Sequence, residues 1–339
     1  MPRRAQLVAL LVLGGGVAGC SGVQTALDPA ADQAASIEVI WRTMLVICGV
    51  MYLLVLGFLA WALWRARRPA AVDDAPLPAE TAAEPALARG LTGWVALIVA
   101  GLLVLTTVSF LVDRSLAEVG PDPLKIKVTA NQWWWQVEYE GDAPTDRFTT
   151  ANELHLPLNR PAVIELHAAD VIHSFWVPNL SGKTDLIPGR TNYMAVTPRR
   201  LGAFRGQCAE FCGFEHAKMA FDVVVDPPRT FEAWRRHQIQ SASDPVTAEA
   251  VYGKQVFTSQ ACVMCHRIQG TDAGATVGPD LTHLASRSHI AAGALPNDTG
   301  DLQAWIADPQ GVKPGTAMPR VALNSGQLNA VVDYLETLK

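Results

Sequence analysis

The sequence has 339 residues, of which half are hydrophobic and 17% charged, and its formal net charge is −5. A mean hydropathy of +0.16 argues against a disordered chain and against a uniformly soluble enzyme, because such values usually reflect membrane segments. No part is basic enough for a nucleic-acid partner. The six cysteines are too few for a disulfide scaffold of this length, so each is interpreted by its spacing.

The N-terminus has the layout of a signal peptide. Arg3 and Arg4 precede a short apolar core, and small residues lead to Cys20. This arrangement resembles the bacterial lipoprotein signal, which predicts removal of residues 1–19 and lipidation of Cys20. The alternative is an uncleaved signal anchor in which the cysteine is incidental.

Two further stretches without charged residues predict a membrane-spanning hairpin. They cover residues 43–64 and 90–112, and a helix of either length could cross the ~30 Å of hydrocarbon in a bilayer. We therefore assign residues 20–119 to a membrane hairpin in contact with lipid, with helices near 39–64 and 91–112.

The loop between these helices predicts the orientation of the chain. Four arginines lie near the membrane ends of the loop: Arg65, Arg67, Arg68 and Arg89. By the positive-inside tendency, this loop lies on the cytoplasmic side. Everything after Val112 is then expected on the periplasmic or outer side of a bacterial inner membrane.

The exported part divides into a β domain and a helical domain. Short runs rich in β-branched residues, separated by Pro, Gly, Asn and Asp, predict an antiparallel β sandwich or barrel over residues 120–228. A short helix and a polar linker are expected over 229–245. Residues 246–339 predict helices joined by long loops, and therefore an all-α domain.

One segment of the β domain concentrates soft metal ligands. Cys208, Cys212, His216 and Met219 fall within twelve positions. Thiolate, imidazole and thioether together favour copper, and electron-transfer copper sites use such ligands. Two cysteines at this spacing could bridge a pair of metal ions, for which His173 is the candidate second imidazole. The alternative is a disulfide, which leaves the histidine and methionine unexplained.

The helical domain contains the covalent attachment motif of a c-type haem. In Cys262-Val-Met-Cys265-His266, both cysteines would form thioether bonds and His266 would be the proximal iron ligand. Met318 lies before a proline in a C-terminal loop and is expected as the distal ligand, which raises the haem potential. The rival distal ligands are His283 and His289.

Three motifs of the β domain resemble subunit II of the haem-copper cytochrome c oxidases. They cover residues 170–176, 182–190 and 208–219. Two membrane helices ahead of a cupredoxin-like domain match this subunit over roughly residues 36–228. The C-terminal domain resembles class I cytochromes c, and the whole resembles the cytochrome caa-type oxidases. The expected fold is a multidomain membrane protein with a two-helix transmembrane hairpin, an all-β cupredoxin-like domain and an all-α class I cytochrome c domain.

The resemblance implies a binuclear copper A centre. The implied ligands are His173, Cys208, the backbone carbonyl of Glu210, Cys212, His216 and Met219. In the family, the glutamate side chain also faces a magnesium ion at the border with the catalytic subunit, a role expected of Glu210. Trp133, in the run Asn131-Gln-Trp-Trp-Trp, is expected to be the residue through which electrons enter above the copper. The alternative for this run is simple packing of large rings.

The resemblance also implies the function. The chain would be subunit II of a respiratory cytochrome c oxidase, with no catalytic residue of its own. It would pass electrons from cytochrome c or an upstream complex, through its haem c and copper A, to subunit I, where oxygen is reduced with proton pumping. Subunit III is a further expected partner.

Three alternatives use the same features differently. The chain could serve a nitric oxide reductase, or be a stand-alone electron carrier or copper-trafficking protein. A quinol oxidase subunit shares the fold but lacks the copper ligands.

One departure from the family concerns proton uptake. Family members often have a glutamate at the start of the second membrane helix, whereas residues 87–94 contain no acidic residue and Glu84 is the nearest one.

Overall fold

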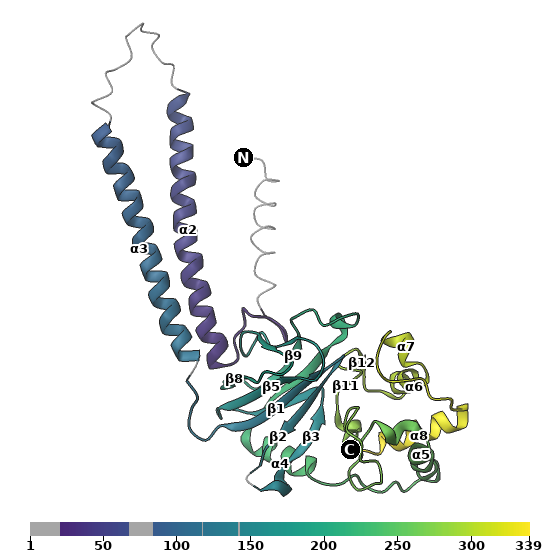
Figure 1. Ribbon diagram of the computed structural model, residues 1–339. Helices are drawn as coiled ribbons and strands as arrows, with labels where there is room; N and C mark the ends of the chain where they lie inside the picture. The colour runs from purple at the N-terminus through teal and green to yellow at the C-terminus, as the bar shows by residue number, and fades with distance from the viewer. Residues whose placement is uncertain (1–20, 68–83, 117, 142) are drawn as a thin grey trace, which may run out of the picture. The chain divides into compact units, whose positions relative to one another are not determined.

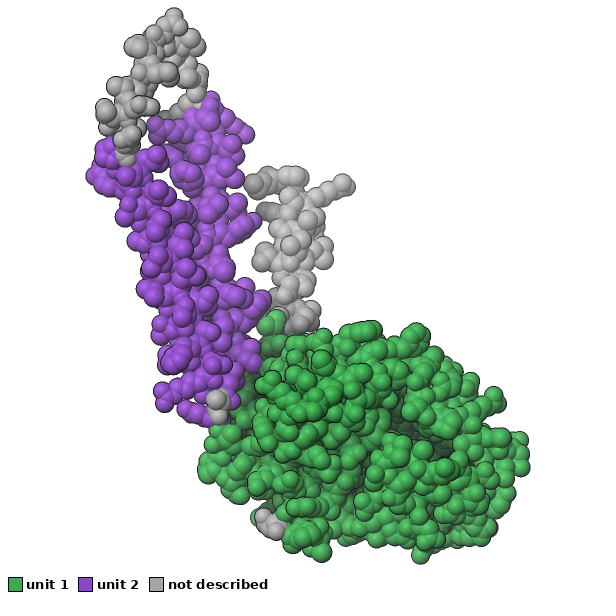
Figure 2. Space-filling model, in the orientation of Figure 1, with its two compact units in different colours: residues 1–35, 119–339 green, residues 36–118 purple. Residues whose placement is uncertain are grey.

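The computed structural model describes residues 21–67, 84–116, 118–141 and 143–339. The expected signal peptide and Cys20 lie outside the described residues. The chain forms two compact units, one of residues 36–118 and the other of residues 1–35 with 119–339 (Figure 2).

The smaller unit consists of two long apolar helices, α2 (Asp32–Ala66) and α3 (Glu84–Leu116) (Figure 1). Their most apolar windows have mean hydropathies of 2.5 and 2.7, sufficient for membrane spans. Both helices extend beyond the uncharged stretches. Their end turns include charged residues, which lie outside those stretches by definition. Cys48 is an exposed free thiol on α2. A helix that is apolar all round needs lipid or another apolar surface around it.

Residues 21–35 pack with the β domain rather than with the hairpin, which corrects the expected boundary at residue 20. The backbone amide of Ala30 donates to the carbonyl of Asn179 at 2.7 Å. Asp28 pairs with Arg200, and Asp32 pairs with Arg199 at 2.7 Å. These partners lie far along the chain, so the local pattern of apolar residues could not indicate them.

The β domain is a sandwich of two five-stranded sheets, with strand orders β3-β2-β1-β5-β8 and β4-β10-β9-β6-β7. The strands of the first sheet are β1 (Leu124–Asn131), β2 (Trp134–Tyr139), β3 (Phe148–Ala151), β5 (Ala162–Ala168) and β8 (Asn192–Val196). Those of the second are β4 (Glu153–Pro157), β6 (His173–Trp176), β7 (Thr184–Leu186), β9 (Gly202–Cys208) and β10 (Ala220–Asp226). The predicted sandwich is confirmed, although β1 with β5 and β4 with β10 pair in parallel.

Large rings fill the core beneath one end of this sandwich. Trp135 is fully buried and meets Phe175 and Phe221 edge-on, at centroid distances of 5.8 and 5.2 Å. Such contacts are worth about 0.5–1.5 kcal/mol each beyond the burial of area. The Trp135 ring also lies 6.3 Å from the ring of His173, so the core supports the first residue of β6.

The expected short helix within residues 229–245 is α4 (Pro228–Gln238), but it belongs to the β domain and not to the connection between domains. Phe231 is fully buried in the core of the sandwich. Trp234 stacks on His155 with a centroid distance of 4.0 Å. The helix therefore covers the sandwich with an apolar face, and only the residues after it act as the connection.

The C-terminal domain is helical, as predicted. Its helices are α5 (Ala248–Ser259), α6 (Thr299–Ala307), α7 (Pro309–Val312) and α8 (Ser325–Glu336), with a small hairpin of β11 (His289–Ile290) and β12 (Leu295–Pro296). Short 3-10 turns occupy Ala261–Met264 and Leu284–Ser286 in this domain, and Pro144–Asp146 and His216–Lys218 in the β domain. Thr247 caps α5, and a capping box formed by Asn324 and Gln327 begins α8.

Candidate metal centres

Strand pairing brings the soft ligands of the β domain together. Strand β9 ends at Cys208 and β10 begins at Ala220, so the other candidate ligands occupy the connecting loop. Strand β6 pairs with β9 in a register that sets Phe175 opposite Cys208. His173, at the start of β6, therefore reaches the same end of the sheet as the loop.

The donor atoms converge on the two cysteine sulfurs. The Sγ atoms of Cys208 and Cys212 are 3.7 Å apart. Cys208 Sγ lies 3.8 Å from His173 Nδ1 and 3.2 Å from the carbonyl oxygen of Glu210. Cys212 Sγ lies 3.6 Å from His216 Nδ1 and 3.8 Å from the sulfur of Met219. All six predicted ligands thus meet at one place, with an imidazole beside each thiol.

The donor set fits a pair of soft metal ions. A disulfide has an S–S distance of about 2.0 Å, much shorter than the 3.7 Å found here. Ligand atoms of His173, Cys208 and Cys212 lie within 4.8 Å of one another, and all three residues are buried. Buried thiols, imidazoles and a thioether around one point are the chemistry that favours copper.

The two thiols share one negative charge when no metal is bound. Cys212 lowers the pKa of the Cys208 thiol, and the resulting thiolate raises the pKa of Cys212. Two adjacent thiolates repel each other unless a cation lies between them. Metal binding would remove the remaining proton, because a cation between the two sulfurs stabilises both thiolates.

Asp170 orients the first imidazole. Its Oδ1 lies 2.8 Å from His173 Nε2, which leaves Nδ1 directed at the Cys208 sulfur. Burial alone would lower the pKa of His173, but hydrogen bonds to Cys208 and Asp170 outweigh burial and raise it. Asp170 lies in the motif of residues 170–176, but its role in orienting His173 follows only from this contact.

Trp133 lies directly against the copper loop. Its indole Nε1 donates to the carbonyl of Cys212 at 3.0 Å, and the Gln132 side chain donates to the same carbonyl at 2.7 Å. A β-carbon at Gly213 would be 3.0 Å from the Trp133 ring. The ring therefore packs against the candidate ligand residue Cys212, and this packing is compatible with the expected electronic role. Gln132 gave no sequence signal apart from its position beside the aromatic run.

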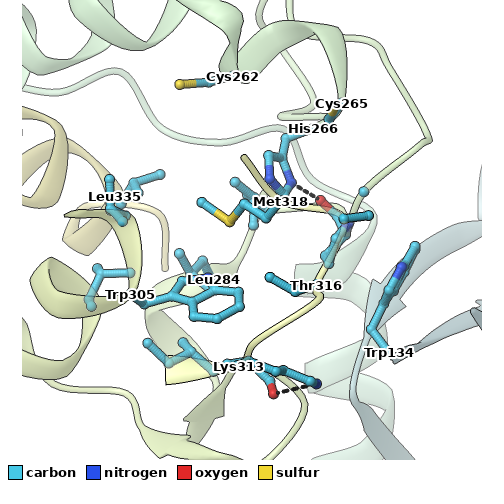
Figure 3. Close-up of a pocket in the computed structure, with 18 of the residues that line it drawn as sticks. Trp134, Cys262, Cys265, His266, Leu284, Trp305, Lys313, Thr316, Met318 and Leu335 are labelled. Carbon is cyan, nitrogen blue, oxygen red and sulfur yellow. Dashed lines mark hydrogen bonds between the residues drawn. The ribbon is translucent and has the colours of Figure 1, made fainter. Parts of the chain in front are cut away.

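The haem motif opens onto an apolar cavity of about 180 Å³. Cys262, Cys265 and His266 line it together with Met318, and Figure 3 shows His266 and Met318 projecting into it from different segments. Leu284, Trp305 and Leu335 contribute apolar walls. A cavity with this lining suits a flat apolar cofactor.

His266, the candidate proximal ligand, is held in a form that could bind iron. His266 Nδ1 lies 2.8 Å from the carbonyl of Pro279, which leaves Nε2 available. Burial lowers the pKa of His266, so the imidazole is neutral. These contacts fit covalent haem attachment at the adjacent cysteines.

The rival distal ligands have other partners. His283 is buried, with its ring nitrogens 2.8 Å from the carbonyl of Lys339 and 3.1 Å from that of Gln240. His289 Nδ1 lies 2.8 Å from a carboxylate oxygen of Asp222. The arrangement therefore favours Met318 as the distal ligand.

The cavity is shared with the β domain. Gln132, Trp133 and Trp134 form part of its lining. A β-carbon at Gly315, close in sequence to Met318, would be 3.6 Å from the Trp133 ring. The ring thus contacts both the copper loop and the loop that carries the candidate distal ligand.

Proteins similar to this chain are known for both exported domains. The family described as "Cytochrome C oxidase subunit II, periplasmic domain" matches residues 142–226, and the family "Cytochrome c" matches residues 250–339. The cytochrome c oxidase subunit 2 of Alkalihalophilus pseudofirmus is 33% identical over 325 residues, which are 95% of this chain and 93% of that protein. The corresponding protein of Bacillus sp. (strain PS3) is 33% identical and aligns over 73% of each chain. The crystal structure of the periplasmic domain of subunit II of cytochrome oxidase from Bradyrhizobium japonicum is 31% identical, with a TM-score of 0.33, and the match covers 36% of this chain and 96% of that one. The chain belongs to the cytochrome c oxidase subunit 2 family and has a cytochrome c domain fused behind its copper A domain.

Proposed function

We propose that this chain is the subunit of a respiratory cytochrome c oxidase that receives electrons and delivers them to subunit I. Its c-type haem and its copper A pair would supply one-electron chemistry, while oxygen is reduced in subunit I with proton pumping. The donor would be a cytochrome c or an upstream respiratory complex, and subunit III would complete the assembly.

The observation that carries this proposal is the convergence of six ligands on two thiols that are not joined by a disulfide. Cys208 and Cys212 would bridge two copper ions, with His173 and His216 at either side. Met219 and the carbonyl of Glu210 would be the weaker ligands. Burial and the contact of Asp170 with His173 hold these groups in place, which favours fast electron transfer because little rearrangement is needed.

For the haem, Cys262 and Cys265 would form the covalent links, and His266 and Met318 would be the axial ligands. The apolar walls around His266 exclude water and so favour the reduced iron. Trp133 would be the residue through which electrons reach the copper loop, since its indole is bonded to the carbonyl of Cys212.

The proposed placement follows from the arginines of the hairpin loop. The two apolar helices would anchor the chain in the bacterial inner membrane, with the copper and haem domains on the periplasmic or outer side. Cys20 would be lipidated after removal of residues 1–19. Mass spectrometry of the mature N-terminus tests this part separately.

We also propose that Glu210 faces a magnesium ion at the border with subunit I. Glu210 Oε2 lies 3.1 Å from Lys183 Nζ, and Asp185 Oδ1 lies 3.5 Å from the same amine. Two carboxylates already surround one cationic group here, and magnesium binds through one or two carboxylates with water. It would have to displace the ammonium group, which manganese substitution followed by electron paramagnetic resonance would detect.

The decisive experiment is metal and haem analysis of the oxidase complex purified from membranes, followed by turnover with reduced cytochrome c and oxygen. We expect one covalent haem and two coppers for each copy of this chain, with oxygen consumption. Turnover with nitric oxide but not with oxygen would assign the chain to a reductase. A fully metallated chain that purifies alone would indicate a free carrier, and a copper-free chain with Cys208 disulfide-bonded to Cys212 would refute the proposal.

A further inference from the structure

Lys313 is a buried lysine that the proposed metal centres do not use. It follows α7 in the cytochrome c domain and is only 2% exposed. Its Nζ donates to the carbonyl of Trp133 at 2.6 Å and to that of Ala291 at 3.1 Å. Burying a lysine is costly unless its donors are satisfied. The carbonyl of Trp133 must therefore stay within hydrogen-bond distance of Lys313 Nζ.

Further contacts lie near this lysine at the junction, by which we mean the contact region between the cytochrome c domain and the β domain. Gly315 lies against the Trp133 ring. The amide of Ala220, which follows the candidate ligand Met219, donates to the carbonyl of Ala292 at 2.9 Å. The cytochrome c domain thus contacts the backbone and the ring of Trp133, and it also binds the first residue of β10.

We propose that Lys313 is a positioning residue, which fixes the haem cavity against Trp133 by binding the backbone carbonyl of that tryptophan. Electron transfer from the haem to the copper pair then takes place across a fixed contact, and not by repeated docking of a mobile haem domain. With both groups bound, one electron would pass from the reduced haem to the oxidised copper pair, and no proton would be transferred. This inference rests on the proposed function.

The charges around Lys313 are compatible with this role. Burial lowers the pKa of Lys313 to about 7, although the nearby Glu215 and Cys212 oppose this shift, while Lys218 adds to it. Glu215 is itself paired with Lys218 at 3.3 Å. A neutral amine still has two N–H donors, so both carbonyls stay bonded whether or not the lysine is charged.

The test compares variants of Lys313 in the purified oxidase complex. Lys313→Met removes the donors but keeps the length of the side chain, and Lys313→Gln keeps an N–H donor without the charge. The control is Asp222→Asn, which removes the negative charge from a partly exposed contact of the same junction, the pair of Asp222 with His289. A ruthenium photoreductant injects one electron, and absorption at the haem α band and at the copper A band follows its transfer.

We expect Lys313→Met to slow haem-to-copper transfer by at least about tenfold, with one haem and two coppers retained. Lys313→Gln should recover part of this loss, and Asp222→Asn should stay within about twofold of the unaltered complex. Redox titration of both centres separates lost positioning from a changed driving force. Hydrogen exchange provides a readout independent of electron transfer: amides of residues 289–293 and 312–316 should exchange faster in Lys313→Met.

A second measurement needs no variant and therefore does not depend on folding of the altered chain. The rate of haem-to-copper transfer across a fixed contact should vary by less than about twofold between about 0.05 and about 0.5 M salt. If transfer depended on docking through surface charges, the rate would change strongly, because salt screens those charges. A strong salt dependence, or a Lys313→Met complex that transfers electrons at the unaltered rate, would overturn the role of Lys313. Absence of copper or haem from the unaltered complex would instead refute the proposed function.

Discussion

Asp170 illustrates how a residue outside the ligand set controls a metal ligand. Its carboxylate holds His173 Nε2 at 2.8 Å and so directs Nδ1 toward the Cys208 sulfur. We expect Asp170→Asn to weaken copper binding by about 10- to 100-fold, as is usual when a partner of a metal-bound histidine is altered. Copper titration of the metal-depleted chain measures this. The control is Asp122→Asn, whose side chain is 92% exposed, and equal affinities in both variants would contradict the orienting role.

Met318 makes a separate prediction for the haem. Met318→Ala should leave the haem attached, because the thioether bonds come from Cys262 and Cys265, but should open the distal position to carbon monoxide or cyanide. Loss of the thioether also lowers the potential, since methionine favours the reduced iron. Absorption spectra with and without the added ligand test this. Met264→Ala is the matched control because Met264 is 71% exposed, and unchanged spectra in Met318→Ala would point to another axial ligand.

At the scale of elements, the packing of α5 on α8 sets the stability of the haem domain. The two helices approach so closely at Gly253 that a β-carbon there would lie 1.8 Å from the carbonyl oxygen of Ala330. Gly253→Ala should therefore destabilise this domain by about 1–3 kcal/mol or more, because the helices must separate. Chemical unfolding followed at the haem band of the full chain tests this. Gly300→Ala, in the first turn of α6 where a β-carbon meets no atom closer than 3.5 Å, should cost nothing.

The sequence predicted elements and ligands that are local, and it could not predict those that depend on pairing between distant segments. The loop from Cys208 to Met219 was predictable because its ligands lie within twelve positions of the chain and are chemically distinctive. The sandwich followed from alternating β-branched runs. In contrast, Gln132 contributes through a contact to a carbonyl 80 positions away. The helix α4 was expected, but its burial against the sandwich was not, because that burial depends on the sheet it covers. Neither fact has a local signature.

At the scale of the whole molecule, the sequence predicted the modules but not the junction between the copper and haem domains. This junction is built from polar contacts among residues of ordinary type, such as Arg287 with Glu153 at 3.6 Å and Lys218 Nζ with the carbonyl of Val312 at 2.7 Å. A lysine or arginine in a sequence is usually a solvated surface residue. The burial of Arg287 and Lys313 therefore becomes evident only in the structure that contains both domains. The fused haem domain is therefore part of the same compact unit as the copper domain.

Burial of Lys313 gives this junction a defined dependence on pH. The pKa of Lys313 falls from 10.5 to about 7 on folding, chiefly through burial. Between these two values the unfolded chain binds more protons at this position than the folded chain, so the free energy of unfolding should rise with pH. The slope is at most about 1.4 kcal/mol per pH unit. Below pH 7 both states carry the proton and the slope disappears.

Comparing the unaltered chain with Lys313→Met isolates this contribution from all other titrating groups. Urea unfolding of the full chain at pH 6, 7, 8 and about 9 should give two curves that run parallel below pH 7, and above it their difference should change in favour of the unaltered chain. The unaltered chain gains stability relative to the variant as pH rises, because its buried amine no longer has to hold a proton away from water. If the difference between the two chains were constant from pH 6 to about 9, the amine would not titrate within the junction, and its burial would not persist in solution.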